Sequence, residues 1–153
     1  MINIARRKYA SNTNLKFEPA DITKVDGVQD YDYIFMADVL EHVEDLNGFF
    51  SALNRLTKPG AKIIISVANP LWEPVLMLSE KLGMKMPEGP HWRLSLSQNE
   101  AIFKKNGFQI TDKGYRLLIP KKMPGSDLIN NIFYRYNVMA RFGFIAFWIL
   151  EKN

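Results

Sequence analysis

The stretch of sequence that decides the fold is residues 32–45, DYIFMADVLEHVED. Its apolar run predicts a buried strand over residues 31–37. From residue 44 to residue 57 the apolar side chains recur at helical spacing, which predicts an amphipathic helix. Between the two lies a cluster of polar residues: Asp38, Glu41, His42, Glu44 and Asp45. The pattern therefore places carboxylates and one of the chain's 2 histidines where a buried strand leaves its sheet.

Strands and helices alternate along the rest of the chain. The pattern predicts strands over 15–17, 62–67, 108–119 and 142–151. It predicts helices over 2–10, within 70–90, from a capping box at Ser97 to Gly107, and over 127–139. This alternation favours an α/β domain with a largely parallel sheet, and the length of 153 residues fits a single domain, 1–153.

Composition excludes several classes of protein. The chain has no cysteine, so it has no disulfide partner and no thiolate metal site, which is compatible with a reducing compartment such as the cytoplasm. The longest apolar run, residues 142–150, is too short to span a bilayer as a helix. The net charge of +4 is mildly basic, with tight clusters at residues 6–8 and 121–122. Nucleic acid or an anionic membrane surface could bind there, but solvated faces explain such runs more often.

Several pieces together resemble a class I S-adenosylmethionine-dependent methyltransferase of the small-molecule type. They are MINIARRKY (1–9), LKFEPADI (15–22), residues 32–67 and HWRLSLSQNEAIFKKNGFQI (91–110). The end, FGFIAFWILEKN (142–153), resembles the last strand of that family, which runs antiparallel to the others. The resemblance implies a Rossmann-like sheet and S-adenosyl-L-methionine as the cofactor.

The resemblance also implies where the cofactor lies. Asp21 matches the acidic residue that accepts a hydrogen bond from the adenine amino group, and Ile22 would flank the ring. Met36, Ala37 and Asp38 match the strand end that lies against the methionine part. From the residues alone, the alternative is that Asp21 is a turn or cap residue and Ile22 a core residue.

The most diagnostic element of the family is absent from the sequence. None of the 9 glycines forms the G-x-G turn that follows the family's first strand. In the family's strand order, 3-2-1-4-5-7-6, the chain would lack strands 1 and 2 and the glycine-rich loop. The strand at 31–37 would then expose an apolar edge, and such edges pair with other chains. We therefore expect a C-terminal portion that binds the cofactor weakly by itself and needs an N-terminal segment or self-association.

The polar cluster allows two interpretations. Asp38, Glu41 and His42 would share one face of a helix and, with His91, could hold a metal, as in the E-x-x-E-H motif of small-RNA and ubiquinone-pathway O-methyltransferases. Here an aspartate replaces the first glutamate of that motif. Without a metal, His42 and His91 are candidate catalytic residues, or they merely cap a helix and hydrogen-bond in a loop.

Residues 70–96 are expected to form a substrate-side insert or lid. Trp72, Met77, Met84 and Met86 would cover the acceptor, or else pack onto the sheet. The leading hypothesis is methyl transfer to a small-molecule acceptor, lipid-like or quinone-like. The alternatives are a non-catalytic interaction module and a fragment of an RNA methyltransferase, whose RNA binding would depend steeply on salt.

Overall fold

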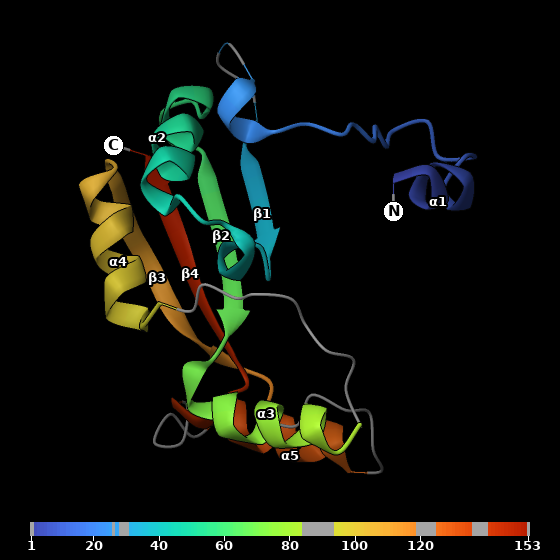
Figure 1. The fold of residues 1–153 in the computed structure, drawn as a ribbon, viewed down its shortest axis with the longest axis vertical. Helices are drawn as coiled ribbons and strands as arrows, with labels where there is room; N and C mark the ends of the chain where they lie inside the picture. Colours follow the sequence, from blue (N-terminus) through green and yellow to red (C-terminus); the bar gives the residue numbers. More distant parts are fainter. Residues whose placement is uncertain are drawn as a thin grey trace.

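The computed structural model describes residues 2–25, 27, 31–83, 94–118, 125–135 and 141–152. Figure 1 shows the elements in chain order. The strands are β1 Tyr33–Ala37, β2 Lys62–Ala68, β3 Phe108–Arg116 and β4 Ile145–Lys152. The α-helices are α1 Ile2–Lys8, α2 Leu46–Leu56, α3 Glu73–Lys81, α4 Leu96–Lys105 and α5 Ser126–Arg135. The 3-10 helices are η1 Ile22–Lys24, η2 Leu40–His42 and η3 Pro70–Trp72.

The four described strands form one mixed sheet in the order β1-β2-β4-β3. β1 pairs in parallel with β2, whereas β4 runs antiparallel to both β2 and β3. The expected α/β fold with an antiparallel last strand is therefore confirmed. β2 is hydrogen-bonded on both sides, which agrees with its nearly unbroken run of β-branched residues.

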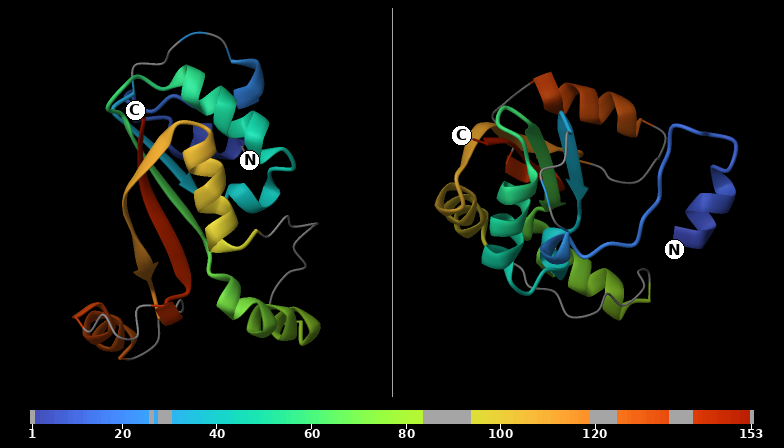
Figure 2. Two further views of the ribbon diagram at one scale, coloured as in Figure 1. Left: turned by 90° about the vertical axis from the view of Figure 1, so that its left-hand side faces the viewer. Right: turned by 90° about the horizontal axis from the view of Figure 1, so that it is seen from above.

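One face of the sheet carries the core. Alternate residues of β2 and β4, among them Ile63, Ile65 and Trp148, point to this face and are buried. Helices α2 and α4 cover it, as both views of Figure 2 show. Phe50 of α2 meets Phe103 of α4 edge to face, with ring centroids 5.0 Å apart. These aromatic contacts fasten the two helices to the sheet and to one another.

The edge of the sheet at β1 is exposed. Tyr33 and Phe35 are 61% and 74% exposed, although both are large apolar side chains within a strand. Among the described residues, β1 has a neighbouring strand on one side only, β2. The expected apolar edge is therefore present.

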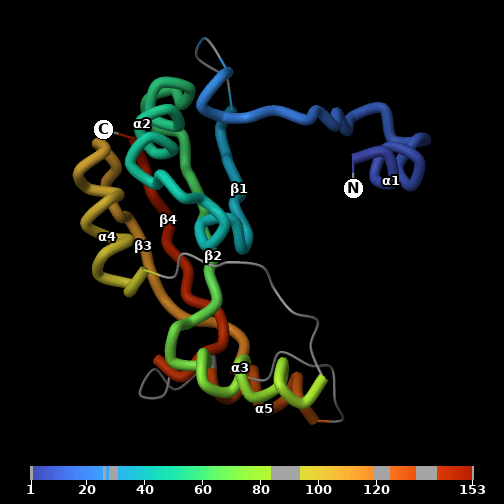
Figure 3. Tube along the Cα trace, viewed as in Figure 1, coloured from blue at the N-terminus to red at the C-terminus, as the bar shows by residue number. Residues whose placement is uncertain are grey.

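The N-terminal helix α1 stands apart from the sheet and is joined to it by an extended segment. Figure 3 follows the chain from α1 along an extended segment to η1, next to the start of β1. The Arg6 guanidinium donates a hydrogen bond of 2.6 Å to the carbonyl oxygen of Phe17, whose ring stacks on Tyr9. The strand predicted at residues 15–17 is wrong, because no described strand lies alongside to pair with this backbone.

The start of α4 differs from the prediction by two residues. Its N-cap is Ser95, whose hydroxyl accepts from the Gln98 N–H while the Gln98 side chain accepts from the Ser95 N–H. This earlier capping box is used because it lets Leu94 and Leu96 pack against the core. The end of the helix is as predicted, with Gly107 at a φ of +83° after the C-cap.

The remaining elements match their predictions with shifted ends. The last helix, α5, starts at Ser126, and the last strand, β4, starts at Ile145 rather than residue 142. Among the described residues, no helix is both long enough and apolar enough to cross a membrane.

We predict that the two faces of this sheet respond differently to truncation of a phenylalanine. Phe50→Ala should lower the free energy of unfolding by about 3–5 kcal/mol, because it empties a site at the centre of the core. Phe35→Ala, the matched control, should change it by less than about 0.5 kcal/mol, because the ring is exposed. Urea unfolding followed by circular dichroism measures both. A large loss for Phe35→Ala would contradict the open edge and show that the β1 ring is covered in solution.

Candidate functional site

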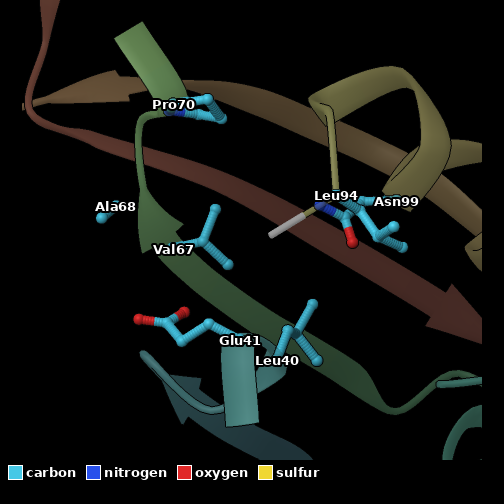
Figure 4. A pocket seen from close by; sticks show the side chains of 7 residues that line it. All are labelled: Leu40, Glu41, Val67, Ala68, Pro70, Leu94 and Asn99. Atoms are coloured by element: carbon cyan, nitrogen blue, oxygen red, sulfur yellow. The ribbon is translucent and has the colours of Figure 1, made fainter. Parts of the chain in front are cut away.

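The candidate site is a cavity at the carboxyl ends of β1 and β2. It is small: about 20 Å³ is open to the centre of a water-sized sphere, which is about enough for one water molecule, within about 340 Å³ of empty space that includes open solvent. Figure 4 shows the described side chains that line it: Leu40, Glu41, Val67, Ala68, Pro70, Leu94 and Asn99. The carboxyl ends of parallel strands are where open α/β sheets bind ligands.

Asp38 sets the way the chain leaves β1. Its N–H donates a 3.0 Å hydrogen bond to the carbonyl oxygen of Ser66, which extends the pairing with β2 by one residue. Its φ of +51° lies in the left-handed region, which aspartate tolerates better than most residues. The chain turns there into η2, so Leu40 enters the core and Glu41 lines the cavity.

Asn69 fixes the way the chain leaves β2. Its buried side-chain amide donates to the carbonyl oxygens of Arg141 at 2.9 Å and Gly143 at 2.7 Å. Its Oδ1 accepts from the N–H of Leu71 at 3.1 Å. These bonds tie the exit of β2 to the entrance of β4. Asn69 is not among the residues predicted from the sequence, although an Asn-Pro pair is a turn signal.

Glu100 anchors the α4 side of the cavity. Its carboxylate accepts hydrogen bonds from Lys113 Nζ at 2.8 Å and from the Trp148 indole N–H at 3.1 Å. Burial by itself would raise the pKa of Glu100, but these two donors outweigh burial and hold the pKa below its ordinary value of 4.5. α4 is thereby bound to both β3 and β4.

The predicted adenine-side residues lie elsewhere. Asp21 is the N-cap of η1, and its Oδ1 accepts from the Thr23 N–H at 3.0 Å and the Thr23 hydroxyl at 2.7 Å. These bonds lower the pKa of its carboxyl. Ile22 is half-buried and packs against the core. Asp21 thus acts as the cap residue that the sequence also allowed.

The structure does not bring Asp21 together with the end of β1. η1 lies at the amino end of β1 and contacts α2, whereas Asp38 follows the carboxyl end of β1 (Figure 1). The reason is that residues 15–20 pair with no described strand, so nothing holds Asp21 at the carboxyl edge of the sheet. A cofactor role for Asp21 and Ile22 stays a prediction.

The residues predicted at the end of β1 are divided between core and surface. Met36 is 7% exposed and belongs to the core, whereas Ala37 and Asp38 are exposed. Their contact with a cofactor also stays a prediction, with only Ala37 and Asp38 accessible from outside.

The candidate metal ligands do not form a cluster in the part of the chain that the structure describes. No three of its His, Asp and Glu side chains are placed to hold a metal ion. Asp38 precedes η2 in a left-handed conformation, so it does not share a helical face with Glu41 and His42. His42 is exposed on η2, and His91 lies outside the described residues.

Trp72 packs against the start of β4 and does not point into the cavity. Its indole N–H donates to the carbonyl oxygen of Phe142 at 2.9 Å, and its ring meets Phe144 edge to face. This is the packing interpretation of the sequence analysis. α3 buries no residue, Met77 is exposed on it, and Met84 and Met86 lie outside the described residues. The assignment of residues 70–96 as a substrate-side insert stays a prediction.

Comparison with known proteins identifies the family. Residues 2–113 match the model of a family described as a methyltransferase domain. Since this match covers well over half of the chain, the chain belongs to this methyltransferase family.

Individual relatives agree with this assignment. The mitochondrial ubiquinone biosynthesis O-methyltransferase of Dictyostelium discoideum is 29% identical over 94 residues, which cover 58% of this chain and 29% of that protein. The magnesium protoporphyrin IX methyltransferase of Synechocystis PCC 6803, solved with bound SAH, superposes with a TM-score of 0.58 at 19% identity. That match covers 100% of this chain and 59% of the Synechocystis chain.

A methyltransferase of Thermotoga maritima that depends on S-adenosylmethionine superposes with a TM-score of 0.68 at 16% identity, covering 100% of this chain and 69% of that one. At such identities a structural likeness establishes the fold alone. The chain therefore has the Rossmann-like methyltransferase fold, and it spans less than a third of the Dictyostelium relative.

We predict that the Glu100 contacts give a pH-dependent contribution to stability. Because the pKa of the folded state is lowered, the contribution is present above pH 4.5 and is lost as the pH falls through the folded value. At about pH 7, Glu100→Gln should lower the free energy of unfolding by about 1–2 kcal/mol. Below the folded-state pKa, where the Glu100 carboxyl is protonated, the variant and the wild type should approach equal stability. Thermal unfolding at a series of pH values measures the difference.

Glu44→Gln is the matched control, since Glu44 is exposed. A Glu100→Gln effect that is unchanged at low pH would show that the side chain stabilises α4 by its shape and not by its charge.

Proposed function

We propose that this chain is the C-terminal portion of an enzyme that transfers a methyl group from S-adenosyl-L-methionine to a small-molecule acceptor. The observation that carries the proposal is the match of residues 2–113 to the methyltransferase family, in which the exposed residues Ala37 and Asp38 end β1 at the carboxyl edge of the sheet. The cofactor assignment is supported by the fold shared with the Synechocystis enzyme that binds SAH.

The described residues supply one wall for the cofactor. Ala37 and Asp38 are exposed at the carboxyl end of β1, where the Asp38 N–H donates a hydrogen bond to the Ser66 carbonyl oxygen of β2. The cofactor, when bound, supplies a methyl group on a sulfonium. The residues of this chain would hold the acceptor in line with that methyl group. Catalysis of this kind comes largely from proximity and orientation.

The side chains at the carboxyl ends of β1 and β2 favour an acceptor that is mostly apolar. Leu40, Val67 and Leu94 form apolar walls, and Glu41 places a carboxylate at the rim. A lipid-like or quinone-like compound would fit this chemistry better than a charged peptide. Glu41 is a candidate to orient a hydroxyl of the acceptor, and His42 and His91 remain candidates for the general base of the reaction.

We further propose that tight cofactor binding requires another strand beside β1. The exposed Tyr33 and Phe35 and the unpaired edge of β1 support this, as does the position of Asp21 at the opposite end of the strand. An unpaired apolar edge favours association. The strand could come from a longer polypeptide, or a second copy could cover the edge, and light scattering of the 153-residue chain distinguishes the two.

We predict that S-adenosylhomocysteine binds this chain weakly but at the proposed place. At millimolar concentration it should shift the backbone amide resonances of Ala37 and Asp38 in ¹⁵N-labelled protein. Adenosine monophosphate, which lacks the homocysteine part, should leave these two resonances unchanged. Calorimetric titration at micromolar concentration should give no binding heat.

The two measurements test different parts of the proposal. Unchanged resonances at Ala37 and Asp38 with S-adenosylhomocysteine would overturn the proposed cofactor site. Micromolar affinity in the calorimeter would overturn the requirement for another strand while leaving the methyltransferase function in place.

A further inference from the structure

Helix α3 turns its apolar side chains outward. Together with η3 it presents a stripe of side chains at helical spacing, each 53–65% exposed: Leu71, Val75, Leu78 and Leu82. The half-buried side of the helix carries polar groups instead, among them Glu73, Ser79 and Glu80. A helix on the surface of a globular protein in water normally shows the opposite arrangement, with its apolar stripe toward the core. The outer face of α3 is therefore suited to an apolar surrounding.

Helix α5 has the same inverted arrangement. Its buried positions include Ser126 and Asn130, whereas Leu128, Ile129 and Ile132 are 43–65% exposed. Within the described part of the chain, nine of the fifteen exposed large hydrophobic side chains fall in residues 71–82 and 128–142. Single exposed apolar residues need no explanation, but a concentration of them marks an interaction surface.

The two helices lie at the same end of the molecule. Figures 1 and 2 show α3 and α5 running crosswise to the strands, on opposite sides of the sheet, at the end to which β1 and β2 point. Amphipathic helices that lie flat with an apolar face outward are the arrangement found at the surface of a bilayer. The carboxyl ends of β1 and β2 are thus on the side of the molecule that such a surface would face.

The positive charge of the chain is concentrated around α5. Of the 20 Lys and Arg residues, six lie in residues 113–141, whereas only one of the 16 acidic residues, Asp127, lies there. The rest of the chain is close to neutral. Arg116 and Arg141, in the described part of this segment, are exposed. A second copy of the chain would bring the same positive charge and be repelled, whereas anionic lipid headgroups would be attracted.

We propose that the exposed faces of α3 and α5 form a docking surface for an anionic lipid bilayer, and that their apolar side chains insert into the bilayer interface. The docking itself rests on the inverted helices and the charge, and does not require enzyme activity. Its use rests on the proposed function. A lipid-like or quinone-like acceptor lies in a bilayer, and the docked chain would present the carboxyl ends of β1 and β2 to it.

The first test is binding to vesicles of defined composition. The 153-residue chain should co-sediment with vesicles of about 30% phosphatidylglycerol and about 70% phosphatidylcholine, and should bind pure phosphatidylcholine at least about tenfold more weakly. Added salt should weaken binding to the mixed vesicles, because it screens the attraction between surface charges. No binding to the mixed vesicles, or equal binding to both kinds, would overturn the proposal.

The second test removes the apolar contribution of α3. Leu78→Gln combined with Leu82→Gln should weaken binding to the mixed vesicles at least about tenfold, because two apolar side chains no longer insert. Ile4→Gln combined with Leu15→Gln is the matched control, since both positions are exposed and lie outside α3 and α5. The control should bind like the wild type. Circular dichroism confirms that both variants keep their helices.

Equal loss of binding in these two double variants would overturn the assignment to α3. Self-association of the wild type that the α3 double variant abolishes, without vesicle binding, would assign the face to a second copy and overturn the bilayer.

The third test concerns the charge. Arg141→Gln should weaken binding to the mixed vesicles by about threefold, because Arg141 lies beside the docking surface. Arg55→Gln, which makes the same change at an exposed arginine of α2, should have no effect. Unchanged binding of Arg141→Gln, or an equal loss in both variants, would overturn the proposed match of charge between this face and the lipid.

These outcomes are independent of the cofactor experiment, because no vesicle test contains S-adenosylhomocysteine. If the chain binds anionic vesicles through α3 but S-adenosylhomocysteine leaves Ala37 and Asp38 unchanged, the docking surface stands and the proposed cofactor site falls. If the reverse occurs, the methyltransferase function stands and the bilayer docking falls.

Discussion

The structure depends on one set of contacts, the packing of Phe50, Phe103 and Trp148 over the buried face of β2. Phe103 meets Phe50 and Trp148 edge to face, with ring centroids 5.0 and 5.4 Å away. These three rings come from α2, α4 and β4, so they join elements that are far apart in the sequence. Because β2 lies between β1 and β4, the same contacts hold the two strand ends at which the cavity forms.

The cavity follows from the way the chain leaves this core. Asp38 continues the pairing of β1 for one residue and then turns into η2, which brings Glu41 over the end of β2. Hydrogen bonds from Asn69 join the end of β2 to the segment before β4, and hydrogen bonds to Glu100 join α4 to β3 and β4. Asn99, next to Glu100, is therefore held in the cavity wall by a rigid helix.

Much of the fold could be predicted because its signals are local. The β-branched run of β2 and the helical spacing of α2 each appear within a dozen residues, and both elements formed where the pattern placed them. The failed strand at residues 15–17 shows the limit, since an extended segment becomes a strand only when another strand is available to bond with it. The start of α4 was misplaced for a related reason. Ser95 and Ser97 both offer a capping hydroxyl, and packing of Leu94 and Leu96 against the core decides between them.

The sequence by itself determined the resemblance to the family, the order of strands and helices from β1 onward, and the polar cluster at the end of β1, because each depends on residues that are close together in the chain. Only the tertiary structure decided that Asp21 caps η1 away from the end of β1, that Asn69 spans two strand ends and that Asn99 is buried. These facts depend on which groups meet across long sequence separations. A polar side chain has the same chemistry whether it caps a helix, links two strand ends or binds a ligand. Only its neighbours in space distinguish these roles.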